Sequence, residues 1–217
     1  MRTVSALRAL TLAVTIGSAS QTVGAQQFVQ PNASYLSRTT LLPMTATLGT
    51  SFTTLTDGFL TVGFASAVSA AEVPDTWSTW STAPESEYAG AGGFRVGTSS
   101  GESNTMTFSR MLTIWGFEAE PNVFGEFEMT ATFLRGGSTV ATVSRLVNGD
   151  AGARLFAFED AGGFDAVRFE TSSDADGFAQ AQFRYAATTV PEPSTYALMG
   201  IGLFAVAVVS RRRKASV

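Results

Sequence analysis

The chain ends in a pattern that sets its last 28 residues apart from any soluble fold. Tyr196–Val209 contains only apolar residues and glycine, and four basic residues follow it: Arg211, Arg212, Arg213 and Lys214. As a helix this run is roughly 21 Å long, so neighbouring residues must help it cross a hydrocarbon core of roughly 30 Å. A packed core helix rarely ends in four positive charges, and the positive-inside rule keeps such charges in the cytoplasm. We therefore expect one transmembrane helix at about 195–210, a cytoplasmic basic end at 211–214, and all earlier residues outside the inner membrane.

A Pro-Glu-Pro triplet stands just before this helix. Pro191 and Pro193 have a fixed φ and lack an N–H, so they end any preceding strand. Glu192 between them lies in an extended segment that a protease can reach. We expect the chain to be processed in this segment, within a terminal unit that spans residues 190–217.

The other end of the chain has the organisation of a secretory signal peptide. Two arginines precede an apolar run from Ala9 to Ile16, and small residues lead to Ala25. The run has no polar face, which disfavours an amphipathic helix at the start of the folded domain. We expect signal peptidase to remove residues 1–25, with cleavage after Ala19 as the alternative.

Residues 26–189 remain as one expected domain, which is long enough to bury an ordinary core. This segment carries eight basic residues against seventeen acidic ones, a net charge of −9. Such a balance disfavours nucleic-acid binding and permits divalent cations. The chain has no cysteine and no histidine, which excludes disulfides, Ser-His-Asp and Cys-His catalysis, and the usual zinc sites.

Two segments of this domain alternate apolar and polar residues with the period of a strand. In Glu126–Leu134 the apolar set is Phe127, Met129, Ala131 and Phe133. In Phe178–Tyr185 it is Ala179, Ala181, Phe183 and Tyr185, with Gln180, Gln182 and Arg184 opposite. Seven further segments are candidate strands: Thr47–Leu55, Phe59–Ala65, Thr105–Phe108, Leu112–Phe117, Thr139–Leu146, Arg154–Phe158 and Phe164–Glu170.

Glycine, asparagine and aspartate separate these segments, as in Asn148-Gly149-Asp150, and no segment between the termini has a sustained helical period. About nine short strands at this spacing predict an all-β domain. We expect an antiparallel β-sandwich of jelly-roll type, with an up-and-down barrel as the second option.

The ordered sequence of Pro191-Glu192-Pro193, an apolar helix and a basic end resembles the sorting signal of PEP-CTERM proteins, which are exported by Gram-negative bacteria that make extracellular polysaccharide. The resemblance implies that an exosortase processes the protein near Pro-Glu-Pro and delivers it to the cell surface or matrix. Parts of the domain, such as Ile114–Asn122 and Asn148–Ala157, also resemble the jelly-roll ectodomain common in that family. That resemblance implies a sandwich similar to carbohydrate-binding modules, with a mostly unassigned activity.

Two clusters of oxygen ligands are candidate cation sites. Asp174 and Asp176 beside Gly177 place two carboxylates on a flexible turn, which suits calcium, although a solvated acidic turn is the more common origin of such a pattern. Glu118 and Glu120 stand near Asn122 at a strand end, where we expect surface charge in preference to a metal site. The chain shows no complete calcium loop, and the sequence requires no cofactor.

Flat aromatic side chains beside polar groups are the feature that a sugar-binding surface requires. Trp77 and Trp80 in Trp-Ser-Thr-Trp fit this description best, although core or rim packing is the alternative for both. At a spacing of three, only one of them is free if the segment is a regular strand. We expect Trp115 to lie in the core and Glu85–Tyr88 to form a solvated loop.

These features leave two classes of function. The first is a non-catalytic surface or matrix protein, associated with exopolysaccharide and delivered by its tail. The second is a secreted polysaccharide hydrolase that uses carboxylates alone. Nothing in the sequence around Glu118, Glu120 or Glu159 indicates a raised pKa, so we favour the first class. A permanently anchored single-pass scaffold differs from it only in keeping the tail.

Overall fold

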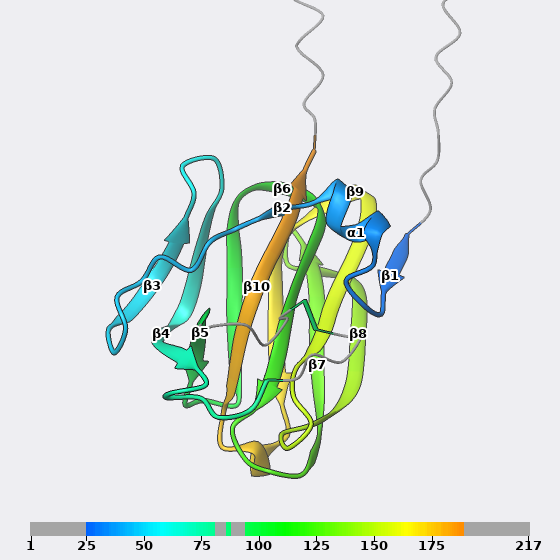
Figure 1. The fold of residues 1–217 in the computed structure, drawn as a ribbon. Helices are drawn as coiled ribbons and strands as arrows, with labels where there is room; N and C mark the ends of the chain where they lie inside the picture. Colours follow the sequence, from blue (N-terminus) through cyan, green and yellow to red (C-terminus); the bar gives the residue numbers. More distant parts are fainter. Residues whose placement is uncertain (1–24, 81–85, 88–93, 189–217) are drawn as a thin grey trace, which may run out of the picture.

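A computed structural model describes residues 25–80, 86–87 and 94–188 (Figure 1). The predicted signal peptide and membrane helix lie outside these residues. The described elements, in chain order, are β1 (Gln26–Phe28), α1 (Ala33–Arg38), β2 (Thr40–Leu41), β3 (Ser51–Thr56), β4 (Thr61–Val73), β5 (Phe94–Ser99), β6 (Ser103–Pro121), β7 (Glu126–Arg135), β8 (Ser138–Asn148), β9 (Arg154–Thr171), a 3₁₀ turn η1 (Ser173–Ala175) and β10 (Phe178–Ala187). None of the helices in the described ranges has the length and apolar character needed to cross a bilayer.

All strand pairs are antiparallel, which confirms the all-β class. The strands form one hydrogen-bonded network in the order β2-β10-β5-β4-β6-β9-β7-β8, with β1 added to β9 and β3 to β4. The first part of β6 pairs with β4, and its last part pairs with β10. β6 therefore changes its neighbour along its length, from β4 to β10.

β6 and β9 each correspond to two of the predicted short strands. Thr105–Phe108 and Leu112–Phe117 both belong to β6, and β9 likewise contains two predicted segments. The two strands pair along most of their length, with register shifts between Thr107 and Leu112 and between Leu112 and Ile114. Irregular pairing in this region lets the two strands bend together. The boundaries between the predicted pairs were therefore wrong.

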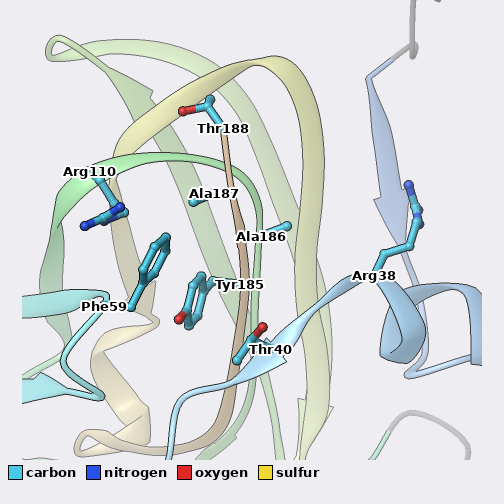
Figure 2. A pocket seen from close by; sticks show the side chains of 8 residues that line it. All are labelled: Arg38, Thr40, Phe59, Arg110, Tyr185, Ala186, Ala187 and Thr188. Carbon is cyan, nitrogen blue, oxygen red and sulfur yellow. The ribbon is translucent and has the colours of Figure 1, made fainter. Parts of the chain in front are cut away.

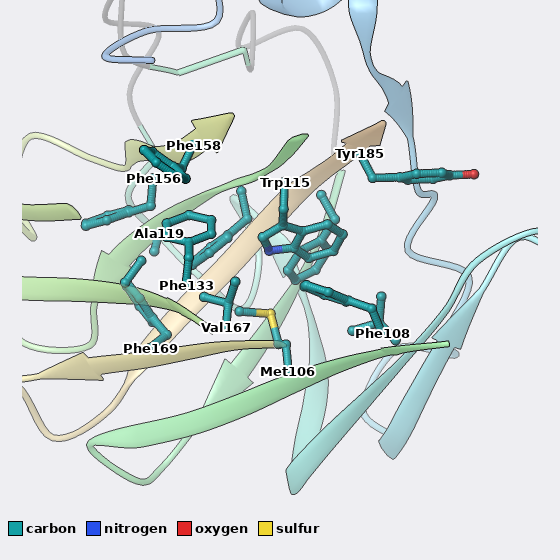
Figure 3. Packing of buried hydrophobic residues seen from close by; sticks show 14 of the residues in the cluster. Met106, Phe108, Trp115, Ala119, Phe133, Phe156, Phe158, Val167, Phe169 and Tyr185 are labelled. Carbon is teal, nitrogen blue, oxygen red and sulfur yellow. The ribbon is translucent and has the colours of Figure 1, made fainter. Parts of the chain in front are cut away.

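The main core is one cluster of buried side chains from most of the strands, and aromatic rings make up much of it (Figure 3). Trp115 is fully buried, as predicted, with its ring centroid 4.7 Å from that of Phe108. Phe117 meets Phe169 edge-on at 4.9 Å, a favoured geometry for aromatic pairs. The alternation predicted for β7 is confirmed at its buried positions, which are Met129, Ala131 and Phe133.

β10 does not keep one regular alternation. Ala179 and Ala181 pack in a small cluster with Trp80, whereas Phe183 and Tyr185 belong to the main core. Gln182 has a φ of 52°, and the pairing with β6 shifts between Ala181 and Arg184. An extra residue at this bulge exchanges the two faces of the strand. The single apolar face predicted for Phe178–Tyr185 was therefore wrong.

The outer face of β6, β9 and β10 is covered by two segments from early in the chain. The first is β1 with α1, where Phe28 and Tyr35 pack on Ile114 and Leu155. Asn32 caps this short helix by accepting a hydrogen bond from the backbone N–H of Tyr35. The second is the segment after β4, which carries Trp80 onto the same face. Side chains on this outer face are therefore buried.

Candidate functional site

The outer face of β6 carries two buried glutamates. Residues two apart on a strand share a face, so Glu118 and Glu120 both point away from the main core, toward the segment that follows β4. Glu118 is 1% exposed and Glu120 is 0% exposed. The prediction of surface charge at these positions was wrong, because Trp77, Trp80 and Ser86 cover the strand end where they lie.

Residues 74–80 and 86–87 follow β4 and form the described part of a covering segment. Glu118 accepts hydrogen bonds from three groups of this covering segment. Its Oε2 accepts from the indole N–H of Trp80 at 3.1 Å and from the hydroxyl of Ser86 at 2.8 Å, while Oε1 accepts from the backbone N–H of Glu87. Burial raises the pKa of Glu118 to about 7, and the three donors oppose that rise. Burial therefore favours the protonated form of this carboxyl relative to that of an exposed glutamate.

Glu120 lies next to it in a similar environment. The indole N–H of Trp77 donates to its Oε2 at 3.0 Å. Burial raises the pKa of Glu120 to about 7, against the effect of hydrogen bonds from Thr79 and Trp77. The expectation that no carboxyl here has a raised pKa was also wrong. A pKa near neutrality suits general acid catalysis, but the group must also touch its substrate, and these two carboxyls are sealed from solvent.

An ion pair joins the covering segment to β10. The guanidinium of Arg184 donates to both carboxylate oxygens of Glu87, at 2.7 and 2.5 Å. This bond raises the pKa of Arg184, and burial raises that of the nearby Tyr35 hydroxyl. Ser86 and Glu87 therefore do not lie in a solvated loop as predicted. The neighbouring Glu85 and Tyr88 lie outside the described residues.

The two tryptophans proposed for sugar binding differ in exposure. Trp80 is 7% exposed and packs in the cluster with Ala179 and Ala181, so its ring faces protein. Trp77 is half-buried, with its N–H held by Glu120. It borders an open depression of about 320 Å³, whose polar lining includes Thr76, Thr98, Ser100, Asn122 and Asp176. The structure thus brings Trp77 and Asp176 together.

The candidate calcium ligands lie at the turn between β9 and β10. Asp174, in η1, accepts a hydrogen bond from Ser173 at 2.9 Å, and Asp176 is left-handed with a φ of 49°. The backbone carbonyl of Asp176 accepts from the side-chain amide of Asn122 at 3.0 Å. Across the ranges that the structure describes, no three acidic side chains converge in a way that would hold a metal ion.

The chain leaves the domain at the end of β10. Thr188 donates its backbone N–H to the carbonyl of Met111 at 3.2 Å, and it is the last described residue. Residues 189–214 match the family model of the PEP-CTERM protein-sorting motif. The chain therefore carries a PEP-CTERM sorting motif. No protein in a search of curated proteins matches the chain.

The PEP-CTERM motif implies an exported protein that an exosortase processes and that is sorted to the cell surface. Its matched range contains Pro191, Glu192 and Pro193 together with the basic residues Arg211–Lys214. The matched range begins at residue 189, directly after the last described residue, Thr188. The side chains of the motif lie outside the described residues.

The buried glutamate pair is the feature that sequence reasoning placed wrongly. One signal was available, because Glu118 and Glu120 interrupt a strand whose other residues from Ile114 onward are apolar or glycine. Charged residues facing solvent along one strand normally alternate with apolar ones over its whole length. Here the two acidic residues of β6 both lie in its last third, where Trp77 and Trp80 of another segment pack against the strand.

Proposed function

We propose that the PEP-CTERM tail delivers a non-catalytic protein of the cell surface or extracellular matrix, which associates there with exopolysaccharide. The sorting motif at residues 189–214 is the observation that carries this proposal. In our account signal peptidase removes residues 1–25, and the helix at about 195–210 holds a single-pass intermediate in the inner membrane. The exosortase then releases the ectodomain, which we propose to be a jelly-roll-like sandwich. Retention of the tail would instead make the protein a permanent scaffold.

The depression beside Trp77 supports the link to polysaccharide. A pyranose has an apolar face that packs on an aromatic ring and a rim of hydroxyls that need polar partners. Trp77 supplies a half-exposed indole, and its orientation is fixed because Glu120 accepts its N–H. Asn122 and Asp176 border the same depression and offer amide and carboxylate groups. No metal or other cofactor is part of this proposal.

A carboxylate-dependent hydrolase is the second candidate, and one observation favours it. The pKa values of Glu118 and Glu120, both raised to about 7, lie where an acid catalyst works well. Against it, burial at 1% and 0% exposure leaves no room for a sugar ring to contact either carboxyl. Turnover of host polysaccharide that the double variant Glu118→Gln, Glu120→Gln abolishes, without unfolding, would support the hydrolase and refute our proposal.

Replacement of Trp77 by alanine is expected to weaken retention of the host exopolysaccharide about tenfold, the loss that about 1.4 kcal/mol of stacking corresponds to. Retention is measured by affinity electrophoresis of the exported protein in gels that contain the polysaccharide. Asp176→Asn, which removes only a charge, is expected to weaken it less.

Phe124→Ala is the matched control, since Phe124 is an aromatic residue 64% exposed and outside the depression. Its retention is expected to equal that of wild type. Equal retention by Trp77→Ala, with its fold intact by circular dichroism, would remove this site from the proposal.

A further inference from the structure

A second cavity of about 620 Å³ opens where the chain leaves the domain (Figure 2). Its lining includes Phe59 from the turn before β4, Arg110 from the bend of β6, Tyr185 from β10 and Thr40 from β2. Thr188, the last described residue, also lines it. Thr188, which directly precedes the sorting motif, therefore lines this cavity, which we call the exit pocket.

An aromatic stack forms one side of the exit pocket. The rings of Phe59 and Tyr185 are nearly parallel, 14° apart, with centroids separated by 6.1 Å. The Tyr185 hydroxyl donates to Asp57 at 2.6 Å, which fixes the ring. Burial and this bond raise the pKa of Tyr185 to about 12, so the hydroxyl remains a donor at neutral pH. Phe59 is 51% exposed, unusually open for so large an apolar side chain.

Arg110 supplies a cation beside this stack. Its guanidinium carbon lies 3.8 Å from the centroid of the Phe59 ring. Four other arginines of the described residues pair with carboxylates, and Arg110 makes no such pair among them. A guanidinium that stacks on an aromatic ring keeps its N–H groups available at its edges. The exit pocket thus combines an exposed aromatic surface with a positive charge that has no carboxylate partner among the described residues.

The sorting motif can reach this surface. Pro191, Glu192 and Pro193 are three, four and five residues beyond Thr188, and an extended chain covers about 3.5 Å per residue. Glu192 therefore lies within roughly 14 Å of Thr188. Thr188 is hydrogen-bonded to Met111, the neighbour of Arg110. Thr189 and Val190 must reverse the chain for the motif to return over the pocket.

We propose that Pro191-Glu192-Pro193 binds back into the exit pocket of its own ectodomain. The two prolines pack against Phe59 and Tyr185, since proline-rich segments commonly bind aromatic-lined grooves. The Glu192 carboxylate pairs with Arg110. A motif bound in this way is shielded by the folded domain, and the exosortase reaches it only after it leaves the pocket. This inference rests on the sorting motif and is independent of the proposed role in glycan binding.

Two arguments favour the chain's own motif over an acidic polysaccharide as the occupant. The domain of residues 26–189 carries a net charge of −9, which repels a polyanion that approaches from solution. The motif, by contrast, is tethered, and a short tether gives an effective concentration in the millimolar range. Even a contact of modest strength is then populated.

Disulfide trapping in the full-length chain tests this proposal, and the chain has no cysteine of its own. Thr40 lies opposite Tyr185 in the sheet, and Ser194 follows the motif. Thr40→Cys with Ser194→Cys places one thiol in the pocket and one beyond Pro193, and leaves every proposed contact intact. The protein is purified in detergent from a host without exosortase, and the rate of disulfide formation under mild oxidant is measured.

Arg110→Gln and Phe59→Ser, each added to this cysteine pair, are expected to slow trapping about fivefold, the effect of losing a contact near 1 kcal/mol. Both side chains are exposed, so neither change should unfold the domain. Arg168→Gln is the matched control, since Arg168 is an exposed arginine outside the pocket, and its rate should equal that of the parent.

Trapping that is absent in the parent, or unaffected by Arg110→Gln and Phe59→Ser, would overturn the proposal. Oligogalacturonate is the probe for the other occupant and is titrated against the same variants. Arg110-dependent binding of that sugar, with trapping unaffected by either pocket change, would assign the pocket to an acidic glycan.

Discussion

The unfolding free energy of this protein is expected to fall as the pH rises from about 5 to about 9, and Glu118 and Glu120 are expected to cause most of that fall. Burial raises the pKa of each carboxyl from 4.5 to about 7 in the folded state. An acid whose pKa is raised on folding binds more protons in the folded state than in the unfolded state. Its stabilising contribution is therefore complete below about pH 4.5 and is lost as the pH rises through about 7.

The expected size follows from the same shift. One pKa unit corresponds to about 1.4 kcal/mol, so a pKa raised from 4.5 to about 7 gives roughly 3–4 kcal/mol for each group as an upper bound. Typical domains are stable by only about 5–15 kcal/mol. A rise in pH from about 4.5 to just above 7 should therefore lower the stability of the ectodomain by a large fraction of its total.

Urea unfolding at a series of pH values measures this dependence, with the double variant Glu118→Gln, Glu120→Gln as the comparison. Glutamine keeps the shape of the side chain and does not titrate, so the variant should show a flat profile between pH 5 and 9. Two results would contradict the assignment of this pH dependence to Glu118 and Glu120. One is an unfolding free energy of wild type that rises between pH 5 and 9, and the other is an unfolding free energy of the variant that falls as steeply as that of wild type.

Replacement of Gly177 by alanine is expected to destabilise the fold by about 3 kcal/mol. Gly177 has a φ of 94°, a conformation that residues with a Cβ rarely adopt. A Cβ there would overlap the carbonyl oxygen of Ser99 and lie 3.1 Å from the Cα of Ser100. Both atoms belong to the backbone, so β10 or the turn after β5 must move. The change also disturbs the depression beside Trp77, which Ser99 and Ser100 line.

The variant Gly58→Ala measures the cost of the left-handed backbone conformation alone, without a steric clash. Gly58 has a similar φ of 88°, but no atom lies within 4 Å of the position that its Cβ would occupy. It should cost only about 1 kcal/mol. The unfolding free energies of both variants and of wild type are measured by urea denaturation. An equal loss of unfolding free energy in the two variants would show that the contact between a Cβ at position 177 and Ser99 is not tight.

The sequence predicted the class of the fold and the sorting motif, because both depend on local pattern. Met129, Ala131 and Phe133 alternate with polar residues in a strand that has one buried face, so their burial could be read directly. The prolines, apolar run and basic end of the tail are likewise contiguous, and the family model confirms the motif that they form.

The features that sequence reasoning missed depend on contacts between distant segments. Glu118 is buried because Trp80, which stands 38 residues earlier in the chain, packs over β6 and donates a hydrogen bond to its carboxylate. Gln182 gives no local sign of the bulge that exchanges the faces of β10. β5 and the short helix α1 were not predicted, because β5 has little alternation and a helix of six residues shows no sustained period.

The central claim is that the tail at residues 189–214 directs processing and delivery, and intact mass combined with cell fractionation tests it most directly. Wild type is compared with the double variant Pro191→Ala, Pro193→Ala in the native host. Our account predicts that wild-type protein at the cell surface lacks both residues 1–25 and the segment beyond the Pro-Glu-Pro motif. It also predicts that the variant stays in the inner membrane at a higher mass. Full retention of the tail in the inner membrane by both proteins would contradict the account.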